Sequence, residues 1–315
     1  MTEREISVKA GAKSRRIEVD YLARVEGEGS LSIEMRGGEL HDVKLKIFEP
    51  PRFFEAFLRG RELTEAPDVT ARICGICPVA YMMSAVHAME HALGMAINRQ
   101  IRQLRRLLYC GEWIESHVLH IYMLHAPDFL GYDDAIAMAR DHEHVVKRGL
   151  RMKKAGNQLV SLLGGREIHP INVRIGGFYK LPEEHKFREL LDELKWARDA
   201  AAETVDWTAG LDFPELVRDY EYVALRHDSD YPFNDGRIVS SRGLDISATD
   251  YPEHFEERQV EHSNALQSVR KPGDNAYFVG PMARFNLNRD RLSANTQSLA
   301  SLHGFDRTVH NPFES

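Results

Sequence analysis

The sequence predicts an α+β fold that is mainly α, with a small β region at residues 1–50 and a helical core at residues 51–315. In residues 30–35 and 43–47 apolar and polar residues alternate, which is the pattern of a strand pair with one buried face. From about Phe53 apolar residues recur every three or four positions, as on one side of a helix. Because strands come first and helices follow, we do not expect alternating βαβ units.

Four long helices are predicted after the β region. They cover residues 78–93, 98–125, 133–163 and 182–208. Pro78 stands at the first position of the first helix, where its missing N–H costs nothing, and Gly94 follows the last turn. Gly149 and Gly156 interrupt the third helix pattern. Residues 212–286 mix apolar pairs with Asp and Gly and are predicted as a mixed insert in the helical core. The whole chain is predicted to form one structural domain.

The composition is that of a globular protein. The 315 residues are 43% hydrophobic and 28% charged, with a formal net charge of −7 at pH 7. Nucleic acid is not an expected partner, because phosphate binding needs a concentrated positive patch. The basic cluster Arg102, Arg105 and Arg106 is expected to be a solvated helix face. No run approaches the roughly 20 apolar residues of a membrane span, and no signal peptide is recognised, which predicts a cytoplasmic protein without a membrane span.

Cys74 and Cys77 lie just before a predicted helix. Backbone amides at a helix N-terminus favour the thiolate, which is the form that binds metals. The spacing alone fits a thioredoxin-like redox pair, half of a zinc or iron–sulfur site, or two structural cysteines. The redox pair is disfavoured because no βαβ pattern surrounds it, and a closed zinc site because no second pair occurs. Cys110, in the middle of a helix, is expected to be a packed core thiol.

Several segments resemble nickel-iron hydrogenase large subunits in their order and spacing, and residues 72–77 match the N-terminal cysteine motif of that family. The other matching segments are Arg24-Val25-Glu26-Gly27, residues 54–61, residues 115–120 with Pro127-Asp128-Phe129, and Gly164-Gly165-Arg166 with His169-Pro170 and Gly176-Gly177-Phe178. The resemblance covers most of the chain and is closest to the cytoplasmic NAD(P)-linked and sulfhydrogenase-like group. It implies the nickel-iron hydrogenase large-subunit fold.

The resemblance also implies roles for four residues. Cys74 corresponds to a terminal nickel thiolate, and Cys77 to a thiolate that bridges nickel and an iron carrying cyanide and carbon monoxide. Glu26 corresponds to the first carboxyl group that takes up the proton released from hydrogen, and Glu55 to a magnesium ligand. The implied activity is reversible oxidation of H2 to protons and electrons.

The implied partners are other subunits. Electrons would pass to an iron–sulfur small subunit and then, through diaphorase-type flavin and NAD(P) subunits, to NAD(P), or to polysulfide. No cysteines remain here to hold an iron–sulfur cluster once Cys74 and Cys77 are used. The sequence contains no phosphate-binding glycine motif, so the chain itself is not expected to bind NAD(P).

Two departures from the family pattern stand out. The family commonly has His four positions after the second cysteine, where this chain has Tyr81. The second cysteine pair of the family, in an Asp-Pro-Cys-x-x-Cys motif, is absent from these 315 residues. Two thiolates do not complete the metal site, so we expect the chain to be inactive alone.

Two alternatives to a hydrogenase subunit stay open. One is a non-catalytic scaffold comparable to the quinone-site subunit of complex I, which the presence of Cys74 and Cys77 disfavours. The other is a zinc or redox C-x-x-C protein. His117 and His120 lie three residues apart and share a helix face, as a two-histidine metal pair would, but a packing or supporting role is favoured.

Overall fold

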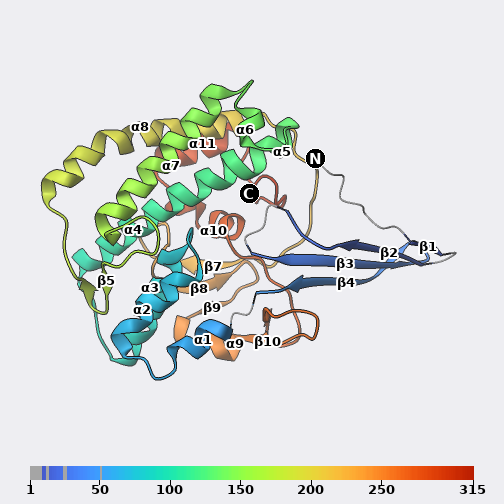
Figure 1. The fold of residues 1–315 in the computed structure, drawn as a ribbon, viewed down its shortest axis with the longest axis horizontal. Coiled ribbons are helices and arrows are strands. Elements are labelled where there is room, and N and C mark those ends of the chain that lie inside the picture. Colours follow the sequence, from blue (N-terminus) through green and yellow to red (C-terminus); the bar gives the residue numbers. More distant parts are fainter. Residues whose placement is uncertain (1–8, 12–13, 24–26, 50–51) are drawn as a thin grey trace. The chain divides into compact units, whose positions relative to one another are not determined.

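A computed structural model describes residues 9–11, 14–23, 27–49 and 52–315 of the chain (Figure 1). Long helices dominate these residues, and the strands form small antiparallel sheets. The α+β, mainly α class predicted from the sequence is therefore confirmed. The chain divides into two compact units, one made of residues 1–56 and 251–276 and the other of residues 57–250 and 277–315.

The first unit contains a four-stranded antiparallel sheet, in the order β1-β2-β3-β4, and a two-stranded one. The strands are β1 (Lys9–Gly11), β2 (Ser14–Val19), β3 (Gly29–Arg36), β4 (Glu39–Ile47), β10 (Phe255–Arg258) and β11 (Gln267–Arg270), and α9 (Tyr251–His254) precedes β10. Hydrogen bonds join the late segment to the early sheet. The Ile47 N–H donates to the Ser263 hydroxyl over 3.1 Å, and the Asn264 N–H donates to the Ile47 carbonyl over 2.9 Å.

The predicted strand pair is confirmed as β3 and β4, but its apolar face is only partly buried. In the register Leu31 pairs with Leu45 and Ile33 with Val43, so these four side chains share one face. Val43 and Leu45 are nevertheless 48% and 44% exposed. The alternation of apolar and polar residues shows which face of the strands is apolar. It does not show whether another element covers that face.

The second unit is built from helices and short strands (Figure 1). The helices are η1 (Leu63–Glu65), α2 (Ala66–Thr70), η2 (Ala71–Ile73), α3 (Pro78–Ala92), α4 (Arg99–Val118), η3 (Leu119–His125), α5 (Ala126–Leu130), α6 (Ala135–Met138), α7 (Glu143–Gly164), α8 (Glu184–Thr208), η4 (Ala248–Asp250), α10 (Pro281–Asn288), η5 (Arg289–Arg291) and α11 (Ala294–Leu302). The strands are β5 (Val173–Arg174), β6 (Gly177–Phe178), β7 (Val223–Arg226), β8 (Arg237–Ser240) and β9 (Asp245–Ile246). Helix α1 (Arg52–Leu58) crosses the boundary between the units.

Three of the four predicted helices are confirmed, and the third prediction is wrong in its first part. The predicted helix over 133–163 divides into α6 and α7, because α6 starts at its own cap, where the Asp134 side chain accepts the Ala137 N–H over 2.7 Å. Neither Gly149 nor Gly156 interrupts α7. A Cβ on Gly149 would lie 2.7 Å from the Tyr122 ring, so this glycine makes room for a neighbour.

Helices α4 and α7 approach each other closely at a pair of glycines. A Cβ on Gly156 would lie 2.8 Å from the Gly111 carbonyl oxygen and 2.7 Å from the Glu115 nitrogen. Around this contact α3, α4 and α7 share a hydrophobic core. Its buried members include Val79, Met82, Met83, Val86, Leu108, Leu159 and Leu163. The methionines at 82 and 83, which follow the cysteines, are thus core residues.

The arginine cluster on α4 is not a solvated helix face, which corrects that expectation. Arg105 is fully buried and donates two hydrogen bonds, 2.8 and 2.6 Å long, to the Glu90 carboxylate of α3. The partner lies 15 residues earlier in the sequence, so charge spacing along α4 gave no sign of it. Burying this guanidinium is tolerated because a carboxylate faces it with matching bidentate geometry.

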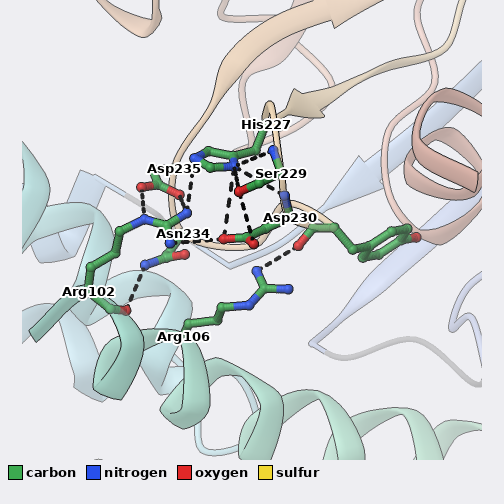
Figure 2. A network of polar contacts seen from close by, with 8 residues as sticks. Arg102, Arg106, His227, Ser229, Asp230, Asn234 and Asp235 are labelled. Atoms are coloured by element: carbon green, nitrogen blue, oxygen red, sulfur yellow. Dashed lines mark hydrogen bonds and ion pairs between the residues drawn. The ribbon is translucent and has the colours of Figure 1, made fainter. Parts of the chain in front are cut away.

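Arg102 and Arg106 hold the connection between β7 and β8 against α4 (Figure 2). The Arg102 guanidinium donates to Asp230 over 2.9 Å and to Asp235 over 2.8 Å, and Arg106 donates to the Tyr231 carbonyl over 2.6 Å. The two carboxylates flank the guanidinium in the picture. The positive charge of Arg102, near the start of α4, is therefore neutralised by two aspartates of a loop more than 120 residues later in the chain.

The glycine contact predicts a large effect of a small substitution. Gly156→Ala should lower the free energy of unfolding by roughly 2 kcal/mol or more, because the added methyl group meets backbone atoms of α4 that cannot swing away. Gly210→Ala is the matched control, since its Cβ would meet only the Trp207 carbonyl at 3.5 Å. Urea unfolding followed by circular dichroism measures both. Equal stabilities of the two variants would contradict the packing described here.

Candidate metal site

The two cysteines lie in a tight turn between η2 and α3. Cys74 follows η2 in an extended conformation, and Cys77 is the N-cap of α3, with Pro78 as its first residue. The Cys74 sulfur accepts the N–H of Cys77 over 3.2 Å and that of Ile76 over 3.4 Å. Backbone donors of this kind orient a sulfur ligand. The turn thus brings both thiols to the start of one helix, which buries one of its faces.

The glycine-rich loop after α7 packs against this turn. The His169 Nδ1 donates to the Ala71 carbonyl over 2.6 Å, and Arg166 donates to the His169 carbonyl over 2.6 Å. His169 has a φ of 49°, which is uncommon for a residue other than glycine. A Cβ added at Gly75 would lie 3.9 Å from a methyl group of Ile168, so the loop leaves room there for no more than an ordinary van der Waals contact. Two segments almost 100 residues apart in the chain are therefore neighbours.

A buried carboxyl group on α4 contacts the first turn of α3. The Glu112 Oε2 accepts the Val79 N–H over 2.6 Å, and the residue is 3% exposed. Burial raises the pKa of Glu112 to about 8, against the opposing effect of the N–H groups of Val79 and Ala80. The sequence analysis did not single out this residue. Its one signal was a charged residue four positions after Leu108, on the apolar face of the helix.

The structure places the predicted site residues unequally. Cys74 and Cys77 are brought together, whereas Glu26 lies outside the described residues. Glu55 belongs to α1 within the other compact unit, so its distance from the cysteines is not defined. Tyr81 lies on the first turn of α3 and is 40% exposed.

The cysteine turn fits part of a site for soft metal ions. Two thiolates at one helix start are suitable ligands for nickel and iron. In the part of the chain that the structure describes, no three or more His, Cys, Asp and Glu side chains are grouped to hold a metal ion. The donor set is therefore compatible with the expected metals but incomplete. None of the described helices has both the length and the apolar character needed to cross a bilayer.

The histidines after the cysteine turn lie in different surroundings. Between Leu119 and His125 the helix widens into a π-turn, and this brings the rings of His120 and His125 to 4.2 Å, edge to face. His117 instead packs against Trp113, whose ring also contacts Phe233 and the Arg284 guanidinium, the latter 4.1 Å from the ring centre. This packing agrees with the supporting role favoured for His117.

His117 should make the protein sensitive to acid. Burial, the charge of Arg284 and that of His120 lower the pKa of His117 to about 4, below its ordinary value of 6.5. Between pH 6.5 and 4 the unfolded chain binds a proton at this position and the folded chain does not, so the free energy of unfolding falls as the pH falls. His117→Gln should flatten this dependence. His144→Gln, which changes an exposed histidine of α7, should not.

The measurement is urea unfolding at a series of pH values for the original protein and both variants. Equal pH slopes for the original protein and His117→Gln would show that His117 is not buried in the neutral form.

Comparison with known proteins places the chain in a family. A family model described as nickel-dependent hydrogenase matches residues 52–149. The chain is 38% identical over 280 residues to sulfhydrogenase 2 subunit alpha of Pyrococcus furiosus, covering 88% of this chain and 64% of that subunit. It is 35% identical over 299 residues to sulfhydrogenase 1 subunit alpha of the same organism, covering 94% and 69%.

Solved structures agree with the sequence relatives. The crystal structure of an NAD+-reducing [NiFe]-hydrogenase in the H2-reduced state superposes with a TM-score of 0.82 at 26% identity, covering 94% of this chain and 71% of that one. The chain thus spans about two thirds of the length of these relatives. It belongs to the family of nickel-dependent hydrogenase large (alpha) subunits.

Proposed function

We propose that the chain is part of an enzyme that oxidises H2 reversibly, and that it contributes two thiolate ligands to a nickel-iron centre. The observation that carries this proposal is the cysteine turn of a chain of this family, in which the Cys74 sulfur accepts two backbone N–H groups and Cys77 is the N-cap of α3. Cys74 would hold nickel, and Cys77 would hold both nickel and an iron that carries cyanide and carbon monoxide, because thiolates suit these soft metals. The metal pair supplies the site at which hydrogen is split.

Two carboxyl groups of this chain have further proposed roles, one in proton transfer and one in binding magnesium. Glu26 receives the proton that leaves the centre, since a carboxyl group passes a proton on when it lies within hydrogen-bond reach of the donor. Glu55 binds magnesium, which prefers oxygen ligands. Because the chain has three cysteines and Cys110 lies inside α4, further thiolates for the metals come from outside these 315 residues.

Electrons leave through partner subunits in the cytoplasm. The chain keeps no cysteine pair for an iron–sulfur cluster, so an iron–sulfur small subunit accepts the electrons. One structural neighbour is NAD+-reducing and two relatives are sulfhydrogenase subunits, which supports diaphorase-type flavin and NAD(P) subunits, or polysulfide, as the next acceptors.

Metal analysis tests the ligand assignment. The protein purified with its partner subunits should contain nickel and iron, and Cys74→Ser or Cys77→Ser should lose most of the nickel together with hydrogen uptake, because a hydroxyl group is a poor ligand for these soft metals. Cys110→Ser is the control and should keep both metals, since burial raises the pKa of the Cys110 thiol and disfavours the ligating thiolate.

The outcomes separate the alternatives. An intact complex without any metal would favour the non-catalytic scaffold, and zinc or a reversible disulfide between Cys74 and Cys77 would favour the generic C-x-x-C protein. Equal nickel contents in all three serine variants would contradict the ligand assignment.

The role of Glu26 is tested by a change that keeps its size. Glu26→Gln should reduce hydrogen oxidation by about 100-fold or more while nickel and iron are retained, because an amide cannot accept and release the proton. Glu28→Gln, two residues along, should leave the rate within about twofold. Hydrogen uptake with an artificial electron acceptor measures the rate, and full activity of Glu26→Gln would refute the assignment.

A further inference from the structure

We propose that Glu112 is a positioning residue for the cysteine turn, whose buried carboxyl group holds the first turn of α3 and with it Cys77. Its consequence for metal binding rests on the proposed function, whereas its effect on the turn itself does not. Sequence reasoning assigned no role to this glutamate, and the family resemblance used above assigns none either.

Helix α3 is capped by a side chain from another helix. The first N–H groups of a helix lack partners within the helix, and the side chain of the N-cap residue usually accepts one of them. Cys77 is the N-cap of α3, but its side chain makes no such hydrogen bond. Instead the Glu112 carboxyl group, from a different helix, accepts the Val79 N–H over 2.6 Å, and the Ala80 N–H faces it as well. The capping task is thereby separated from the cysteine sulfur.

Glu112 and Arg105 both attach α4 to α3 through polar contacts. Seven residues earlier on α4, Arg105 binds Glu90, which lies near the other end of α3. Position rises along α4 while it falls along α3, so the helices run antiparallel and are joined near both ends of α3. Two attachments of this kind prevent α3 from sliding along α4. The start of α3, and therefore Cys77, takes one position.

Burying a carboxyl group at position 112 costs free energy. Glu112 is 3% exposed, and burial raises its pKa to about 8. A leucine at this position would avoid that cost and extend the surrounding core. At the N-terminal end of a helix a buried carboxyl group still finds hydrogen-bond donors, because the first N–H groups of the helix face it. The contact with the start of α3 is therefore what offsets the cost of burying this carboxyl group.

Glu115 offers a matched control. It lies one turn further along α4, is also buried, and pairs with Lys153 of α7 over 2.9 Å. Removing Glu115 deletes a buried carboxyl group from the same helix, but its ion pair points to α7 and not to the start of α3. A general loss of stability should therefore appear in both variants, and loosening of the cysteine turn only in variants of Glu112.

The experiment uses Glu112→Gln, Glu112→Asp, Glu112→Ala and Glu115→Ala. In the metal-free chain, the rate at which iodoacetamide alkylates Cys77 is followed by mass spectrometry, with Cys110 as an internal reference. Glu112→Ala and Glu112→Asp should speed alkylation of Cys77 roughly tenfold, because the cap is lost or the oxygen no longer reaches Val79. Glu112→Gln, whose amide oxygen still accepts the N–H, should stay within about twofold, as should Glu115→Ala. If Glu112→Ala fails to fold, the comparison of Asp with Gln carries the test.

The proposal is overturned if Glu112→Asp and Glu112→Ala leave Cys77 as protected as in the original protein, or if Glu115→Ala exposes it equally. In the complex with its partner subunits, nickel content should fall in Glu112→Ala and be restored in Glu112→Gln. Absence of nickel from the original complex would count against the proposed function alone, because the alkylation rates are measured without metal.

Discussion

The close approach of α4 and α7 at Gly111 and Gly156 is the constraint on which the larger unit depends. Because no Cβ separates the two backbones, α4 lies in the middle of the core and contacts α3 and the β7–β8 connection as well. The polar side chains of α4 therefore contact elements that are distant in the sequence. Arg102 binds the β7–β8 connection, and Arg105 and Glu112 bind the two ends of α3.

This arrangement explains how a flexible chemical group becomes a defined ligand. A cysteine turn by itself allows several conformations, but here the helix that follows it is attached at both ends and the loop around His169 covers the segment before it. Contacts within the chain therefore fix the conformation of the turn without a bound metal. Nickel and iron then require thiolates at fixed positions, and pre-organised ligands of this kind lose little entropy on binding.

Sequence reasoning predicted the elements that depend on local pattern. The helical period gave α3, α4 and α8, and the alternation of residues 30–35 gave β3. Prediction from the sequence failed where the role of a residue depends on a partner that is distant in the chain. Arg105 looked like a surface charge because Glu90 is on another helix, and Gly156 looked like an interruption because Gly111 is on another helix. Glu112 was missed for the same reason. The cysteine turn was found because its chemistry is local, whereas the roles of Glu26 and Glu55 stay predictions.

Cys74 and Cys77 are proposed to supply sulfur ligands to nickel. X-ray absorption at the nickel edge tests this proposal most directly, using the complex purified with its partner subunits. The account predicts a nickel–sulfur shell that loses scattering intensity in the Cys77→Ser protein, or in whatever fraction of it retains nickel, while Cys110→Ser leaves the spectrum unchanged. A spectrum with the same sulfur shell in the Cys74→Ser and Cys77→Ser proteins would contradict the account.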